Sequence, residues 1–107
     1  MYKLCVYVPE EALEQVKSAL FAAGAGRIGC YDSCCWQVKG FGQFRPLNGS
    51  SPYLGQQGKV EQVEEYRVEM VCDDAHIHTA IKALRESHPY EEPAFDVWQL
   101  SDIALIG

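Results

Sequence analysis

Hydrophobic and polar residues alternate in the first eight positions of the chain. Leu4, Val6 and Val8 fall on one side of an extended backbone, and more polar residues fall on the other side. This period of two predicts a β-strand over residues 2–8. A longer alternating run predicts another strand over residues 60–72, with one face exposed to solvent.

Two other segments follow the period of a helix. Apolar residues recur at helical spacing after Pro9 and continue to Gly24, whose missing side chain suits a helix end. A second apolar stripe begins after Asp73 or Asp74 and stops before Pro89. We therefore expect one helix after each of the two alternating strands.

Further strands are predicted over residues 27–38 and 94–100. Residues 39–59, which contain five glycines and two prolines, are predicted to form a loop or a hairpin extension with a short strand near residues 43–46. The chain then reads as strand, helix, strand, repeated once. This order predicts a single α+β domain over residues 1–107, with a ferredoxin-like βαββαβ antiparallel sheet and both helices on one face.

Charge, hydrophobicity and cysteine content limit the classes of partner and the cell compartment that we expect. The net charge of −6 and the lack of a basic patch argue against a nucleic-acid partner. No apolar run reaches the ~18 residues that span a bilayer, and Met1 leads directly into a strand, so we expect no membrane contact and no signal peptide. Five cysteines without a C-x-x-C pair indicate reduced thiols and a cytoplasmic protein.

The small size of the chain favours self-association. A chain of 107 residues buries only about 60–65% of its unfolded surface, so its core is small. Trp98 and Val97 place apolar side chains on opposite faces of the last predicted strand. We therefore expect a homo-oligomer.

The segment after the second helix carries the main candidates for chemistry. His88, Glu91 and Glu92 lie beside Pro89 and Pro93, which restrict the backbone. An imidazole near carboxylates can contact a small ligand or a divalent metal ion, or act in catalysis. The segment can instead be a rigid connector in which His88 caps helix-end carbonyls, and we favour this interpretation.

Arg27 and Cys34 are the next candidates. Arg27 lies in a glycine-rich stretch, residues 24–29, but a helix precedes this stretch and a strand follows it, which is the reverse of a phosphate-binding loop. Arg27 itself remains a candidate residue for contacting an anion. Cys34 is a candidate ligand for a soft metal with Cys30, although Cys34 and Cys35 point to opposite faces of a strand, which favours a core role.

The two helix-to-strand connections, residues 24–29 and 88–93, are expected at equivalent places in the two halves of the fold. One site is then predicted to draw on both. The predicted ligand-binding residues are His88, Glu91, Glu92 and Arg27. The predicted metal ligands, for a divalent ion as the candidate cofactor, are His88, Glu92 and Cys34.

Four segments in order, residues 24–29, 31–34, 42–46 and 88–97, resemble the YqfO-type domain of the Nif-like (NGG-interacting-factor-like) protein family. The resemblance covers about residues 2–100. It implies a fold similar to the PII and CutA proteins, which assemble as trimers. That domain occurs inserted in longer Nif-like proteins and also alone, and the dinuclear metal site of the longer proteins lies in flanking domains, so none of its ligands maps onto this chain.

We therefore expect a small cytosolic module, oligomeric and trimeric by resemblance, that binds a small ligand, a metal ion or a partner protein. The alternative is a small hydrolase-type enzyme using His88 with Glu91 or Glu92. The binding module is favoured because neither a G-x-S-x-G nor an H-E-x-x-H motif is present. No catalytic residue is assigned.

Overall fold

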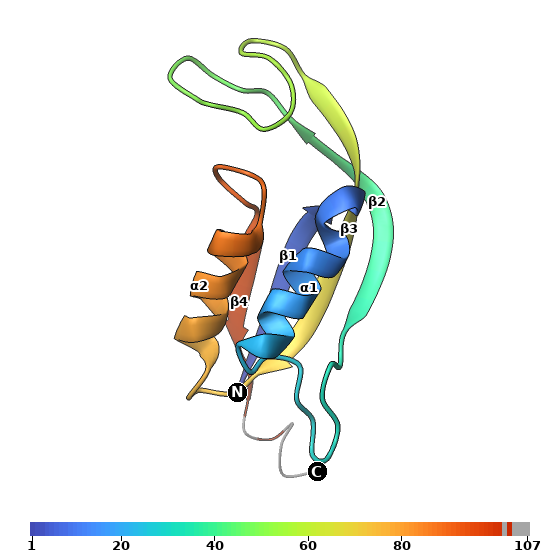
Figure 1. Ribbon diagram of the computed structural model, residues 1–107, viewed down its shortest axis with the longest axis vertical. Helices are drawn as coiled ribbons and strands as arrows, with labels where there is room; N and C mark the ends of the chain where they lie inside the picture. The colour runs from blue at the N-terminus through green and yellow to red at the C-terminus, as the bar shows by residue number, and fades with distance from the viewer. Residues whose placement is uncertain (102, 104–107) are drawn as a thin grey trace.

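The computed structural model describes residues 1–101 and 103. Its four strands form one antiparallel sheet in the order β2-β3-β1-β4, and both helices cover the same face (Figure 1). This confirms the predicted ferredoxin-like α+β fold. The elements are β1 (Tyr2–Pro9), the 3-10 helix η1 (Glu10–Ala12), α1 (Leu13–Ala22), β2 (Trp36–Phe44), β3 (Glu61–Cys72), α2 (Ile77–Ser87) and β4 (Phe95–Gln99).

The core lies between the helices and one face of the sheet. Leu4, Val6 and Val8 of β1 are almost fully buried there, as their alternation predicts. The helices contribute buried apolar residues at helical spacing, and the main ones are Val16, Leu20, Ala80 and Leu84. Burying one of these Val or Leu side chains contributes about 1.5–3 kcal/mol to folding, so this layer sets the position of both helices.

Gly24 ends α1 as predicted. The Gly24 N–H donates to the carbonyl of Phe21, and the Ala25 N–H donates to the carbonyl of Leu20, both at 3.1 Å. This pair of bonds is the Schellman arrangement, which needs a left-handed residue after the helix. Gly24 meets that need with a φ of 103°.

The predicted strand over residues 27–38 is wrong at its start, because β2 begins only at Trp36. Gly26, Gly29 and Ser33 have φ values of 77°, 56° and 57°, which turn the backbone out of an extended path. Residues 27–35 therefore form a looped connection, while β2 continues to Phe44 through part of the predicted loop. The short strand expected near residues 43–46 is the end of β2.

Strands β2 and β3 extend beyond the rest of the sheet. The pairing of β1 with β3 ends at Pro9 and Glu65, whereas β2 and β3 stay paired as far as Phe44 and Glu61. We call residues 41–64, with the loop at their tip, the arm. Figure 1 shows the arm curving over the end of the molecule that carries the connection from α2 to β4.

The sheet face without helices, called here the open face, carries large apolar side chains. Trp98 lies opposite Lys3 across the β1–β4 pair, and Trp36 and Val38 lie on the same face of β2. Their exposed fractions are 46%, 61% and 44%. No helix in the part of the chain described by the structure is long and apolar enough to cross a membrane.

Candidate ligand-binding site

The site is built around residues 88–94, which connect α2 to β4 and are called here the connector. His88 follows the last residue of α2 and is only 6% exposed. Its Nε2 lies 2.7 Å from the carbonyl oxygen of Tyr7, and its Nδ1 accepts the backbone N–H of Tyr90 at 3.1 Å. These partners assign a neutral ring with the proton on Nε2, which donates to Tyr7.

Burial lowers the pKa of His88, and the hydrogen bond to Tyr7 only partly opposes that effect. The connector interpretation therefore describes the role of His88, with one correction. The His88 side chain holds a carbonyl of strand β1, and it is the His88 backbone N–H that caps the helix end, at the Leu84 carbonyl, 2.9 Å away.

Tyr90 joins the connector to the arm. Its ring centroid lies 6.1 Å from that of Phe44, 6.0 Å from that of Tyr53 and 4.9 Å from that of His88. Its hydroxyl is buried and has no hydrogen-bond partner among the described residues. Burial, with smaller contributions from Glu65 and other neighbours, raises the pKa of Tyr90 to about 12, so the hydroxyl stays protonated at neutral pH.

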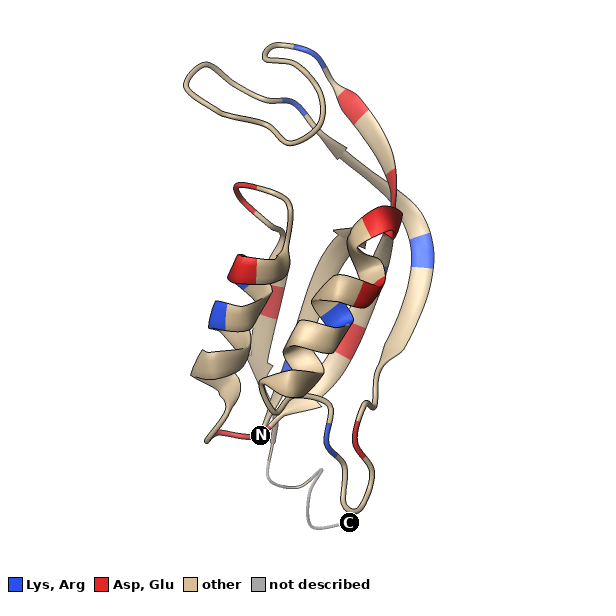
Figure 2. Cartoon of the chain, in the orientation of Figure 1, with Lys and Arg blue, Asp and Glu red and all other residues tan. Residues whose placement is uncertain are grey.

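A second contact ties the arm to the connector. The backbone N–H of Ser51, in the loop of the arm, donates to the Glu91 carboxylate at 3.1 Å. Glu92 is exposed beside it. Figure 2 shows acidic residues on the connector and at the start of the helical segment after β1, at the end of the molecule facing the arm.

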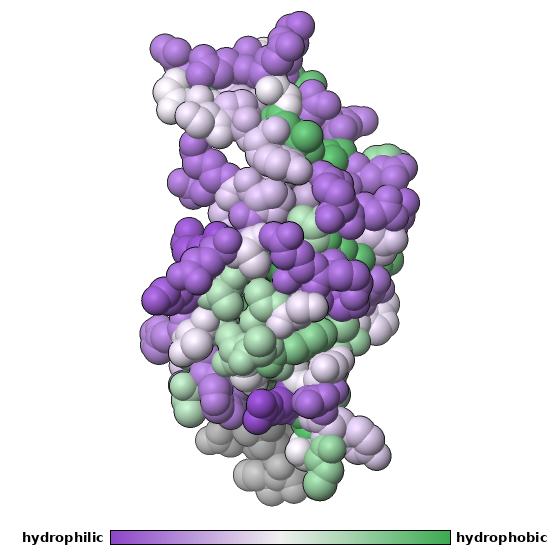
Figure 3. All heavy atoms as spheres, in the orientation of Figure 1, coloured by the Kyte–Doolittle hydropathy of each residue, from purple (hydrophilic) through white to green (hydrophobic). Residues whose placement is uncertain are grey.

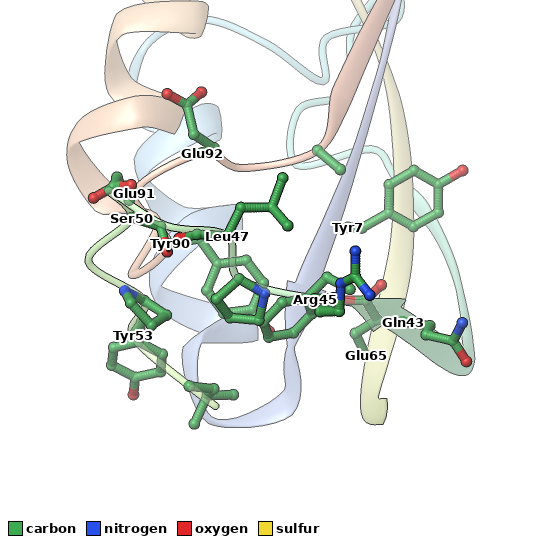
Figure 4. A pocket seen from close by; sticks show the side chains of 15 residues that line it. Tyr7, Gln43, Arg45, Leu47, Ser50, Tyr53, Glu65, Tyr90, Glu91 and Glu92 are labelled. Atoms are coloured by element: carbon green, nitrogen blue, oxygen red, sulfur yellow. Dashed lines mark hydrogen bonds between the residues drawn. The ribbon is translucent and has the colours of Figure 1, made fainter. Parts of the chain in front are cut away.

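A cavity of about 410 Å³ lies between the arm and the connector (Figure 4). Four ionisable side chains other than tyrosines line it, namely Arg45, Glu65, Glu91 and Glu92. Most of the remaining wall is apolar, and its main members are Phe44, Pro46, Leu47, Pro52, Tyr53 and Leu54. In the view of Figure 3 the surface of this end is mainly hydrophilic with a few hydrophobic side chains, and of the apolar lining Leu47 and Tyr53 are 60% and 51% exposed.

Glu65 lines one side of this site, and Gly42 lies next to its carboxylate. A Cβ atom at position 42 would lie 2.0 Å from Oε1 of Glu65, so the carboxylate occupies the space that a side chain would need. Burial raises the pKa of Glu65. Glu65 was not among the predicted site residues, and the signal that points to its contact is the pair Gly40 and Gly42, which lie on one face of β2.

Arg27 and Cys34 do not reach this cavity within one chain. The Gly26 N–H donates to the carbonyl of Val71 at 2.7 Å, near the start of β1, whereas His88 contacts Tyr7 near its end. The two connections are equivalent within their halves, as expected, but they lie at opposite ends of the sheet, so the prediction that one site draws on both is wrong within one chain. Strand β2 runs parallel to β1 and β4 runs antiparallel to it, so the segments that lead into them lie at opposite ends of the sheet.

The structure also does not gather the predicted metal ligands within one chain. Cys34 lies at the opposite end from His88 and Glu92, and the described residues hold no group of three or more His, Cys, Asp or Glu side chains suited to a metal ion. Cys30 is exposed, and Cys34 and Cys35 are half-buried. Only Cys35 of these three packs against the core.

The chain is similar to one part of several longer proteins. No protein-family model matches the chain. It is 43% identical over 102 residues to a Halalkalibacterium halodurans protein and 49% identical over 98 residues to a Mycobacterium tuberculosis protein, both named GTP cyclohydrolase 1 type 2 homolog. These matches cover 95% and 92% of this chain, but it spans only 27% and 26% of the relatives.

Solved structures also match most of this chain. A Bacillus cereus protein related to NIF3 matches with a TM-score of 0.80 and 40% identity, over 94% of this chain and 25% of that one. CutA from Xylella fastidiosa matches with a TM-score of 0.67 and 22% identity, over 94% of this chain and 83% of that one. The second match shows a shared fold.

Proposed function

Since this chain is homologous to the YqfO-type domain of the Nif-like family, we propose that it is a small oligomeric module that binds a small molecule between its arm and its α2–β4 connector. Its homologues are about three and a half times as long, so the activity that their name refers to is not part of the proposal.

The observation that supports this function most is the cavity of about 410 Å³. Ligand sites in proteins are concave, mostly apolar and about 300–1,000 Å³ in volume, with a few polar groups that orient the ligand. The aromatic contacts of Tyr90 and the hydrogen bond between Ser51 and Glu91 hold the two walls together. The site is thus formed before a ligand arrives.

The predicted residues then have different roles. Glu91 and Glu92 lie at the cavity and are proposed ligand contacts. His88 acts as a positioning residue, because it fixes the backbone N–H of Tyr90. Arg27 and Cys34 take part only if a second copy of the chain supplies them, because they lie at the other end of the sheet.

A hydrolase using His88 with Glu91 or Glu92 is less well supported. A general base needs a free ring nitrogen within reach of the substrate. Both ring nitrogens of His88 are occupied by backbone groups, and the ring is buried. The geometry supports binding more than catalysis.

Self-association through the open face is the second part of the proposal. Trp36, Val38 and Trp98 are exposed there at the two edges of the sheet, and Trp is enriched at the centres of protein interfaces. A trimer is the oligomer that the resemblance to PII and CutA proteins implies.

The binding part is tested by screening uncharged and charged fragments with ligand-observed NMR. Leu47 and Val60 are both 60% exposed, but only Leu47 lines the cavity. We expect fragments to bind the wild-type protein and the control Val60→Trp, and to be lost in Leu47→Trp, which fills the cavity. Fragments that bind Leu47→Trp equally well would place the ligand site elsewhere.

A further inference from the structure

The charges around the cavity are unbalanced. Glu65, Glu91 and Glu92 supply three carboxylates, and Arg45 supplies one guanidinium, which leaves a net charge of −2 on the lining. A phosphate-bearing ligand would meet repulsion from these carboxylates and only one basic partner. The lining therefore favours a cation over an anion.

Two polar groups that line the cavity are shielded from solvent, one fully and one in part. The Tyr90 hydroxyl is buried without a hydrogen bond in the described part of the chain. The Glu65 carboxylate is half-buried, and burial raises its pKa. A buried polar group without a partner, such as the Tyr90 hydroxyl, costs about 1–3 kcal/mol.

The two groups are close enough to influence each other. Glu65 contributes to the raised pKa of Tyr90 by its charge, and both side chains line the same cavity (Figure 4). The glycine at position 42 leaves the space into which the Glu65 carboxylate fits. A single positively charged donor placed between them would satisfy the carboxylate and the hydroxyl oxygen together.

We propose that the cavity binds a small organic cation, with its ammonium or guanidinium group at Glu65 and Tyr90 and its apolar body against Tyr53, Pro46 and Leu54. Aromatic faces such as that of Tyr53 also attract cations. This inference rests on the proposed function and adds the chemical class of the ligand.

The test uses three probes with the same phenyl body: 2-phenylethylamine, 2-phenylethanol and 3-phenylpropanoate. Each is titrated into the full chain by NMR, with the ring signals of Tyr90 and Tyr53 as reporters. We expect the amine to bind at least about tenfold more tightly than the alcohol, because hydrogen bonds to charged groups contribute about 1.5–3 kcal/mol. We expect the carboxylate to bind most weakly.

Glu65→Gln keeps the shape of the side chain and should remove the preference for the amine over the alcohol. Asp96→Asn makes the same chemical change on the open face, away from the cavity, and should preserve the preference. Gly42→Ala should displace the Glu65 carboxylate and weaken amine binding, whereas Gly40→Ala, with nothing within 4 Å of its added Cβ, should not.

The outcomes separate the two proposals. If the carboxylate or the alcohol binds as tightly as the amine, or if Glu65→Gln keeps the amine preference, the inference is wrong while the cavity remains a ligand site. If none of the three probes shifts the signals of Tyr90 or Tyr53 at millimolar concentration, both proposals fail.

Discussion

His88 and Tyr7 are 81 residues apart in the sequence, and a 2.7 Å hydrogen bond from the imidazole Nε2 to the Tyr7 carbonyl joins them. The bond attaches the α2–β4 connector to the first strand. The other ring nitrogen, Nδ1, accepts a hydrogen bond from the Tyr90 N–H. One buried side chain therefore fixes the position of the Tyr90 backbone, and with it the place where the Tyr90 ring contacts the arm.

Replacing His88 with Ala should destabilise the fold. The change leaves the Tyr90 N–H without its acceptor and the Tyr7 carbonyl without its donor, and each such loss costs about 1–3 kcal/mol. Urea denaturation should show a loss of this size. His78→Ala, at an exposed histidine of α2, is the matched control and should stay within about 0.5 kcal/mol of wild type. Equal stabilities for the two variants would contradict the role assigned to His88.

Stability should also fall in mild acid. Burial lowers the pKa of His88 below 6.5, so the unfolded chain binds a proton that the folded chain resists. The free energy of unfolding is then highest above pH 6.5 and decreases as the pH falls from 6.5 through the pKa of the folded state. Protonation of His88 at Nδ1 would also place an N–H against the Tyr90 N–H, and the hydrogen bond between them would be lost.

The measurement compares urea midpoints at pH 7.5 and 5.5 for wild type and His88→Gln. The pKa of Glu65 is raised by burial, and its contribution has the opposite sign, but it is common to both proteins and cancels in the difference. We expect the wild type to lose more stability than the variant over this range. Parallel pH profiles would show that His88 does not titrate as proposed.

Two glycines of the α1–β2 connection should differ in their tolerance of alanine. Gly26 and Gly29 both have positive φ, so alanine at either costs about 1–2 kcal/mol in backbone strain. A Cβ at Gly26 would also lie 2.8 Å from Phe21 and 2.9 Å from the backbone oxygen of Cys34, whereas at Gly29 it meets nothing within 4 Å. Gly26→Ala should therefore cost about 1–3 kcal/mol more than Gly29→Ala. Thermal denaturation of the pair measures this difference, and similar midpoints would count against the packing around Gly26.

Trp98→Glu should weaken self-association. The substitution places a charge on the open face, where we propose that copies of the chain meet. Light scattering should give three times the 12.0 kDa mass of the chain for wild type and a lower mass for the variant. Thr79→Glu adds the same charge to an exposed position of α2, on the helical side, and should leave the mass unchanged. A wild-type mass near 12.0 kDa at micromolar concentration would refute the oligomer.

The fold could be predicted because its signals are local. The alternation of Leu4, Val6 and Val8 follows from the strand repeat, and Gly24 and Pro89 mark helix ends by their backbone chemistry. The start of β2 could not be predicted in the same way. Residues 27–35 include apolar side chains typical of a strand, and their left-handed turns depend on a path that the pattern of residues does not encode.

The cavity was beyond prediction because it forms between distant segments. Ser51 and Glu91 are 40 residues apart, and Phe44 meets Tyr90 only because the arm curves towards the connector. The sequence singled out Glu91 and Glu92 by their position between prolines. It gave no reason to choose Glu65, which is one of several glutamates on β3 and lies on a face of that strand where most residues are half-buried.

The pairing of the first and last strands has a consequence for how such a unit can be carried by a larger protein. Tyr2 lies opposite Gln99, and the Leu100 N–H donates to the carbonyl of Met1 at 2.9 Å. The chain therefore arrives and departs at neighbouring points, about 5 Å apart for paired antiparallel residues. A host domain could be interrupted at a single surface loop to accommodate the whole unit without being pulled apart. The relatives, of which this fold makes up about a quarter, are large enough to use that geometry.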